Sequence, residues 1–167
     1  DVGHSCGLSA EERDELYRIV HRPDELLNMA PVDEAIADLS QWEEQGFDIA
    51  IVTGRPPESI DVSLEWLAKH RISHGSFTVV DKYSRFTTDN ANAITLAELS
   101  THRFCWAVED SLPMAHYLAG EMTVPVALID RPWNQSDVEH VRIDRYRDWR
   151  AIAAAAPALI ALNGGRI

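Results

Sequence analysis

Short apolar runs that alternate with segments of helical periodicity constrain the fold of this chain more than any other feature. Four such runs, at 47–52, 77–80, 104–108 and 126–129, read as buried strands. Strands that are apolar along their whole length and separated by helices are typical of a parallel sheet covered on both faces. The sequence therefore predicts an α/β fold with three layers, in which a doubly wound parallel sheet lies between helices.

The segments between these runs carry helix signals. Ser9-Ala10-Glu11-Glu12 has the form of a capping box, and Pro23 limits the helix that starts there. Apolar residues at three- to four-residue spacing predict a second helix from Val32 to Gln45, with Gly46 as its stop. Further helices are expected at 58–70, 90–99, 113–118 and 146–156. Because no linker, repeat or change of composition divides the chain, residues 1–167 are expected to form a single domain.

The charge of the chain limits the partners it can have. It carries 27 acidic against 15 basic residues, for a formal net charge of −12. Such a charge disfavours binding to nucleic acid polymers and to anionic membranes. A small phosphorylated substrate remains compatible with it if a divalent cation neutralises the pocket.

Nothing in the sequence indicates a membrane or secreted protein. No apolar run approaches the roughly 18 to 20 residues that span a bilayer, and the first residues lack the order of a signal peptide. Cys6 and Cys105 show no metal-binding spacing, and Cys105 lies in an apolar run that predicts a buried thiol. We therefore expect a soluble, cytoplasmic protein.

Polar residues follow each predicted strand. Thr53-Gly54-Arg55 comes after the first strand, Asp81-Lys82 after the second, Glu109-Asp110 after the third and Asp130-Arg131 after the fourth. Ligands of open parallel sheets bind at the carboxyl ends of the strands, so these residues are the first candidates for a site. A hydroxyl with exposed amides can hold phosphate oxygens, a lysine can neutralise them and an acid pair can hold magnesium.

Each of these residues also has a plain structural explanation. Thr53 can cap the following helix, Lys82 can be a solvated loop residue, and Glu109-Asp110 can be an acid pair at the start of a helix. Arg55 either contacts substrate or pairs with a surface acid. The recurrence of three such groups in a fixed order favours a functional site.

In this order, the residues Thr53, Lys82 and Glu109-Asp110 match the second, third and fourth motifs of the haloacid dehalogenase superfamily. The chain resembles this superfamily from Pro31 to Ile152, and FDIAIVTGR at 47–55 and VEDSLPMA at 108–115 are close to its motifs. LIDRPWN at 128–134 and RYRDWRAI at 145–152 resemble its deoxyribonucleotidase-like branch, of the 5′-nucleotidase type C-like kind.

The resemblance implies a magnesium-dependent phosphohydrolase that works through an aspartyl-phosphate. Thr53 and Lys82 would be catalytic, with Thr53 holding the phosphoryl group and Lys82 stabilising its charge, while Gly54 and Arg55 would help to bind the phosphate and the substrate. Asp110, with Glu109 directly or through water, would hold Mg²⁺. The substrate would be a small phosphate ester, by analogy a nucleoside monophosphate. A helical insertion at about 3–29 would form a small cap over the site.

One motif of the superfamily is missing from the printed sequence. The first motif, D-x-D, ends the central strand, which would lie between the strands that end at Thr53 and Glu109. Without that strand, buried backbone groups would lack partners at a cost of about 1 to 3 kcal/mol each, so we expect the strand and its nucleophile upstream of Asp1. The apolar segment 158–162 is the alternative strand, but it carries no acid.

Two other functions compete with the hydrolase. A receiver-type signalling domain uses similar residues, but its acid pair precedes the Thr and Lys, whereas Glu109-Asp110 follows both. A catalytically silent relative with a binding or regulatory role is the main alternative, because no nucleophile is present in the printed chain. The sequence gives no indication of the oligomeric state or of a partner protein.

Overall fold

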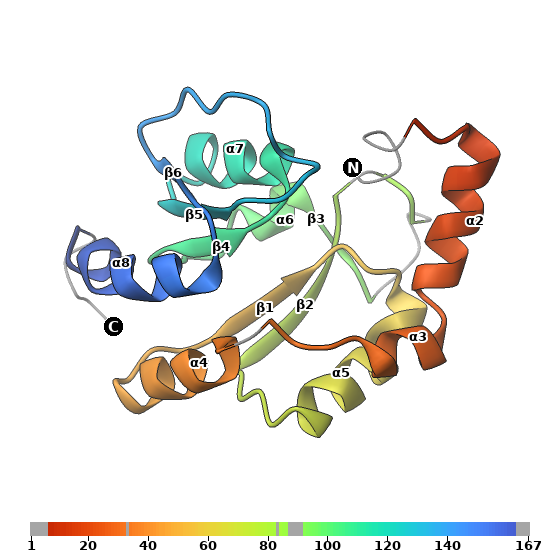
Figure 1. Ribbon diagram of the computed structural model, residues 1–167, viewed down its shortest axis with the longest axis horizontal. Coiled ribbons are helices and arrows are strands. Elements are labelled where there is room, and N and C mark those ends of the chain that lie inside the picture. Colours follow the sequence, from red (N-terminus) through yellow and green to blue (C-terminus); the bar gives the residue numbers. More distant parts are fainter. Residues whose placement is uncertain (1–6, 33, 83, 87–91, 163–167) are drawn as a thin grey trace. The chain divides into compact units, whose positions relative to one another are not determined.

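The alternation of strands and helices is present in the computed structural model, which describes residues 7–32, 34–82, 84–86 and 92–162 (Figure 1). The chain divides into two compact units, of which the first is Gly7–Leu99 and the second contains the described residues from Ser100 onward. Each unit has its own three-stranded parallel sheet with helices beside it. The parallel α/β class is therefore confirmed, whereas a single doubly wound sheet stays a prediction.

The first unit carries the sheet with strand order β1-β2-β3. Its elements, in chain order, are the helices α2 (Ala10–Val20), α3 (Pro23–Asn28) and α4 (Ala35–Glu44), β1 (Ala50–Thr53), the 3₁₀ helix η1 (Pro57–Ser59), α5 (Ile60–Lys69), β2 (Ser76–Asp81), β3 (Ile94–Thr95) and α6 (Leu96–Leu99). β1 and β2 run parallel with Thr53 opposite Val79, so the residues after Thr53 and after Asp81 leave the sheet at the same edge.

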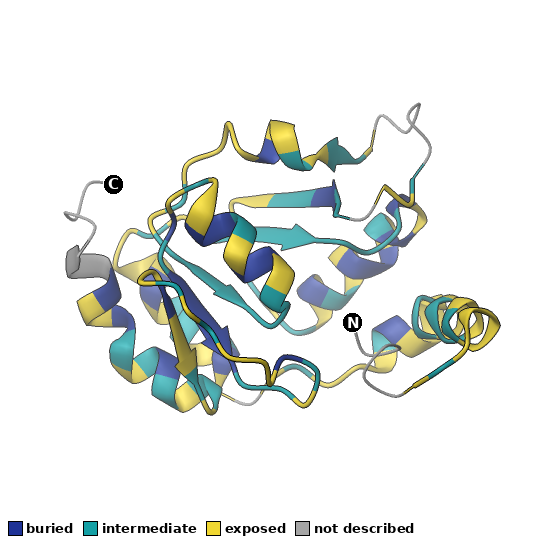
Figure 2. Cartoon of the chain, turned by 90° about the horizontal axis from the view of Figure 1, so that it is seen from above, coloured by how far each residue is buried: buried dark blue, intermediate teal, exposed yellow. Residues whose placement is uncertain are grey.

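Local signals place the first helices of this unit. The capping box is confirmed, since the Glu12 amide donates to Ser9 Oγ at 3.2 Å and the Ser9 amide donates to Glu12 Oε2 at 2.8 Å. No residue of α2 is buried, and the helix shows only exposed and intermediate positions (Figure 2). α4 starts three residues later than predicted because Glu34, its N-cap, has a φ of 69°. Gly46, with a φ of 92°, follows the end of α4 as predicted.

The prediction of a helix over 90–99 is wrong in its extent. Residues 90 and 91 lie outside the described residues, Ile94–Thr95 is the short strand β3, and the helix α6 covers Leu96–Leu99 only. Thr95 and Glu98 form a second reciprocal cap: the Glu98 amide donates to Thr95 Oγ1 at 3.1 Å, and the Thr95 amide donates to Glu98 Oε2 at 2.7 Å. This T-x-x-E pattern marks the true helix start.

The second unit carries the sheet with strand order β4-β5-β6. Its elements are β4 (Ala107–Glu109), α7 (Leu112–Gly120), β5 (Val126–Ile129), β6 (Ile143–Tyr146) and α8 (Trp149–Leu162). All four residues of β5 are buried because helices cover both faces of the central strand: Ala127 and Ile129 pack with Ile152 and Leu159 of α8, while α7 lies over the other face (Figure 1). Cys105 precedes β4 and is exposed, so the prediction of a buried thiol is wrong.

The two strands expected to flank a further strand are each paired on one side. Within the described part of the chain, β1 pairs with β2 alone and β4 pairs with β5 alone. All residues of both strands are only half-buried, in contrast to the fully buried β5. The expected D-x-D strand is not tested by these pairings. None of the described helices is both long enough and apolar enough to cross a membrane.

Candidate functional site

The loop after β1 is organised by the residue that ends the strand. The Arg55 amide donates to Thr53 Oγ1 at 3.2 Å, so the hydroxyl holds the Thr53-Gly54-Arg55 turn together. The N-caps of the next helices are Pro56 for η1 and Ser59 for α5. Thr53 is therefore not a helix cap here; its hydroxyl accepts within the turn and lies at the carboxyl end of a parallel strand.

Lys82 is brought to this loop from the neighbouring strand. Its aliphatic chain lies against Gly54, because a Cβ built at position 54 would meet Lys82 Cδ at 3.1 Å and Cε at 3.4 Å. Lys82 is half-buried, which does not fit a solvated loop lysine. This packing places the Thr53-Gly54 loop beside Lys82 at one edge of the sheet.

Asp81 fixes the segment that carries Lys82. Its Oδ1 accepts from the Arg85 amide at 2.8 Å and its Oδ2 accepts from the Phe86 amide at 3.2 Å. These bonds hold the turn after β2, so the position of Lys82 depends on its neighbour in sequence. Sequence reasoning missed this role, although an aspartate that follows a strand and precedes a turn is the usual signal for it.

The side chain of Arg55 is partly buried and forms no ion pair with a described carboxylate. Its Nη1 donates to Ser63 Oγ at 3.0 Å and its Nη2 contacts Met29 Sδ at 3.8 Å, and no described residue offers it a carboxylate. Burial lowers the pKa of the Arg55 guanidinium, which nevertheless stays charged at neutral pH. Pairing with a surface acid is therefore not its role in this structure, and its charge is available to an anionic ligand.

The helix α2 adds an aromatic pair that sequence reasoning also missed. The rings of Tyr17 and His21 are 4.2 Å apart, and the Arg85 guanidinium lies over the Tyr17 ring at 5.1 Å. His21 Nδ1 is 2.6 Å from the Tyr17 carbonyl oxygen and donates to it in the neutral ring. Burial, with smaller effects from the charges of Arg55 and Arg85, lowers the pKa of His21. The i, i+4 spacing of the two rings is the signal that was available.

The acid pair lies in the second unit, at the end of β4. Glu109 Oε1 accepts from the Asp110 amide at 3.1 Å and from the Ser111 amide at 2.9 Å, so this carboxylate helps to shape the start of α7. Among the residues that the structure describes, the Asp110 carboxylate accepts no hydrogen bond and joins no ion pair. Glu109 thus acts in part as an acid at the start of a helix. The carboxylate of Asp110 has the oxygen atoms that a hard cation such as Mg²⁺ would use.

A complete metal cage is not formed by these residues. The described part of the chain contains no group of three or more His, Cys, Asp or Glu side chains that could hold a metal ion. Glu109 and Asp110 supply two carboxylates, which suits a magnesium ion that keeps several waters and binds a substrate phosphate. The predicted Mg²⁺ is not tested by this arrangement.

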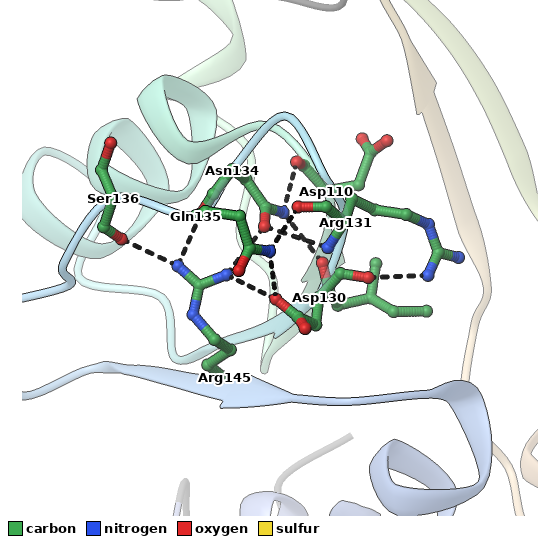
Figure 3. Close-up of polar contacts among 8 residues, drawn as sticks. Asp110, Asp130, Arg131, Asn134, Gln135, Ser136 and Arg145 are labelled. Carbon is green, nitrogen blue, oxygen red and sulfur yellow. Dashed lines mark hydrogen bonds and ion pairs between the residues drawn. The ribbon is translucent and has the colours of Figure 1, made fainter. Parts of the chain in front are cut away.

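Asn134 joins the acid loop to the loop that follows β5 (Figure 3). Its side chain is buried, and its Nδ2 donates to the Asp110 carbonyl at 2.8 Å and to the Ile129 carbonyl at 2.9 Å. Its Oδ1 accepts from the Arg131 amide at 3.1 Å and from Arg145 Nη1 at 2.7 Å. The sequence offered Asn134 no clear role, because these partners are far from it along the chain.

Arg145 of β6 holds the loop that contains Asn134. Its Nη2 donates to the carbonyls of Asn134 and Ser136 at 2.6 and 2.9 Å, and its Nη1 pairs with Asp130 Oδ1 at 3.0 Å. Asp130 also accepts from Gln135 Nε2 at 2.7 Å. The hydrogen bond from Gln135, followed by that from Arg145, lowers the pKa of Asp130. Asp130 is thus committed to this network.

The predicted site residues fall into two groups. Thr53, Gly54, Arg55 and Lys82 belong to the first unit, and Glu109 and Asp110 belong to the second. Comparisons with protein-family models, with curated proteins and with solved structures gave no match for this chain. The structure shows a parallel α/β fold, and no family is shown by these comparisons.

Proposed function

We propose that this chain carries the phosphate- and metal-binding motifs of a magnesium-dependent phosphohydrolase of the haloacid dehalogenase superfamily, in its deoxyribonucleotidase-like branch. The substrate would be a small phosphate ester, with a nucleoside monophosphate as the best candidate. The observation that carries the proposal is the packing of Lys82 on Gly54 beside the Thr53 turn. A hydroxyl, a glycine backbone and an ammonium group at one sheet edge are the groups that a transferring phosphoryl group needs.

The proposed roles follow from the local chemistry. Gly54 lets the backbone approach a phosphate closely, and the Thr53 hydroxyl donates to one of its oxygens. The Lys82 ammonium group, on a stem fixed by packing, neutralises the charge that develops during transfer. Arg55 is half-buried and contacts only neutral groups, so its charge is suited to bind a further part of an anionic substrate.

Magnesium would be held by Asp110, with Glu109 as its neighbour. The two carboxylates, of which that of Asp110 is unengaged among the described residues, fit an ion that prefers oxygen ligands and retains water. When bound, the ion would neutralise phosphate charge in a protein whose own net charge is −12. The α2 helix, with Tyr17 and His21 near the two arginines, would be the cap that selects the rest of the substrate.

The mechanism also requires an aspartate nucleophile from a D-x-D motif, which the printed sequence lacks. In the proposal this motif ends a strand that pairs with β1, whose second edge is unpaired within the described residues. The aspartate takes the phosphoryl group as the alcohol leaves, and water then hydrolyses the aspartyl-phosphate to release phosphate.

The test uses the full natural protein and the two lysines of the chain. Phosphate release from a panel of nucleoside monophosphates is measured with Mg²⁺ and with a chelator. Lys82→Ala is expected to lower the rate by about 10² or more, the usual effect of removing one group that stabilises the transition state. Lys69→Ala is the matched control, because Lys69 donates to the Leu27 carbonyl at 2.6 Å and has no place in the mechanism.

Two results would contradict the proposal. If Lys82→Ala kept the activity of the natural protein, the phosphoryl site would be misplaced. If the natural protein bound phosphate or a nucleotide without turnover, the catalytically silent alternative would replace the hydrolase.

A further inference from the structure

The hydrogen bonds of Asn134 use every donor and acceptor of its side chain. Nδ2 donates both of its protons, to the carbonyls of Asp110 and Ile129, while Oδ1 accepts from Arg131 and Arg145. The side chain is 1% exposed, so an unmet polar group at this position would be costly. Only an amide both donates and accepts in this way, since a carboxylate cannot donate and a leucine can do neither.

The orientation of this amide is fixed from outside. Arg145 Nη1 and the Arg131 amide both point at Oδ1, so a flip of the amide would place two donors against Nδ2. Arg145 also donates to the Asn134 carbonyl, which holds the backbone as well as the side chain (Figure 3). The arginine therefore directs Nδ2 of Asn134 towards the Asp110 carbonyl.

Asn134 contacts Asp110, the acid that the proposed function assigns to Mg²⁺. Asp110 lies directly after β4, and Asn134 comes from the loop after the neighbouring strand β5. Glu109 holds the Asp110 amide from one side, and Asn134 holds its carbonyl from the other. Both peptide groups of Asp110 are thus fixed, while its carboxylate is unengaged among the described residues.

We propose that Asn134 and Arg145 are positioning residues that hold the backbone of Asp110 so that its carboxylate is presented to Mg²⁺. This inference rests on the proposed function, because it assumes that Asp110 binds the ion. Neither residue touches the metal or the substrate. Side chains that orient a metal ligand from behind commonly change metal affinity by about 10- to 100-fold when they are replaced.

The experiment measures Mg²⁺ binding to the full natural protein by calorimetry, without substrate, for a set of variants. Asn134→Asp keeps the shape of the side chain but cannot donate to Asp110, and it is expected to raise the Mg²⁺ dissociation constant about tenfold or more. Arg145→Lys is the second variant, on a residue at the surface, and it keeps the charge but not the forked contacts. Its dissociation constant is expected to rise less, by about threefold to tenfold.

Gln135→Ala is the matched control. Gln135 belongs to the same loop and donates to Asp130 and to the Arg131 carbonyl, yet it has no contact with Asp110 among the hydrogen bonds of this network. Its Mg²⁺ affinity should equal that of the natural protein. A positioning role also predicts that raised Mg²⁺ restores phosphate release in Asn134→Asp, whereas damage to the fold would leave the rate low at every Mg²⁺ concentration.

Asp110→Asn distinguishes a wrong metal site from a wrong positioning role. If it leaves Mg²⁺ binding unchanged, the metal site of the proposed function is wrong and this inference falls with it. Asp110→Asn could instead weaken Mg²⁺ binding while Asn134→Asp and Arg145→Lys, both folded, bind Mg²⁺ as tightly as Gln135→Ala. In that case only the positioning role is overturned. Weaker binding in all three, with rescue by added Mg²⁺, supports both.

Discussion

The stem of Lys82 lies against Gly54, with Cδ only 3.1 Å from the place that a Cβ at position 54 would occupy. Gly54→Ala must therefore displace this stem by a few tenths of an ångström. Because small misplacements of a catalytic group are costly, kcat/KM for phosphate release is expected to fall about threefold to tenfold. Steady-state kinetics on the full natural protein measures this change. Gly120→Ala, where the new methyl would meet nothing within 4 Å, is the control and should keep full activity.

Ile152 is a fully buried residue of α8 and packs on Ala127 and Ile129 of β5. Ile152→Ala removes this packing and leaves a cavity, so the free energy of unfolding of the second unit is expected to fall by about 2 to 5 kcal/mol. Urea unfolding followed by circular dichroism measures the change. Ile19→Ala, at a position that is 39% exposed, makes the same chemical change and should cost less than about 1 kcal/mol. Equal losses for the two variants would show that α8 does not cover β5.

Ser9 and Ser111 are both N-cap residues, but only Ser9 makes a side-chain cap bond. Ser9→Ala is expected to destabilise α2 by about 1 kcal/mol, because one amide of the first turn loses its acceptor. Amide hydrogen exchange along α2 should accelerate accordingly, with no change in the strands. Ser111→Ala should leave the exchange of α7 unaltered, and acceleration there would mean that the two caps are equivalent.

His21 is expected to titrate below its ordinary pKa of 6.5, chiefly because burial disfavours the charged ring. The folded state then binds fewer protons than the unfolded state between the lowered pKa and 6.5. Stability from the neutral ring is therefore present above pH 6.5 and is lost as the pH falls through that interval. An NMR titration of the ring measures the value directly. A pKa at or above 6.5 would contradict the dominant effect of burial, because the hydrogen bond to the Tyr17 carbonyl acts in the opposite direction.

The sequence predicted best the strand that is buried on both faces and the helix ends that are set by neighbouring residues. The strand at 126–129 was predicted with its observed bounds, because an apolar run buried on both faces leaves no ambiguity. The capping box at Ser9 and the stop at Gly46 needed only their own neighbours. The Thr53 loop and Lys82 were brought together by the parallel pairing that the pattern implied.

The rest depended on contacts that no local pattern contains. β6 was missed because it is an edge strand in which Asp144 and Arg145 are exposed, so its sequence does not read as apolar. The position of Asn134 is set by Asp110, 24 residues away, and by Arg145, 11 residues away. Such outcomes are decided by tertiary packing, not by propensity.

Strand order in both sheets follows the order of the chain, β1-β2-β3 and β4-β5-β6, so each described pairing joins strands that are consecutive in sequence. Pairings of this kind close short stretches of chain and carry a small loss of loop entropy. Units that hold their own pairings open and close as separate cooperative blocks. Each sheet can therefore assemble on helices of its own unit, and loss of one sheet need not unfold the other.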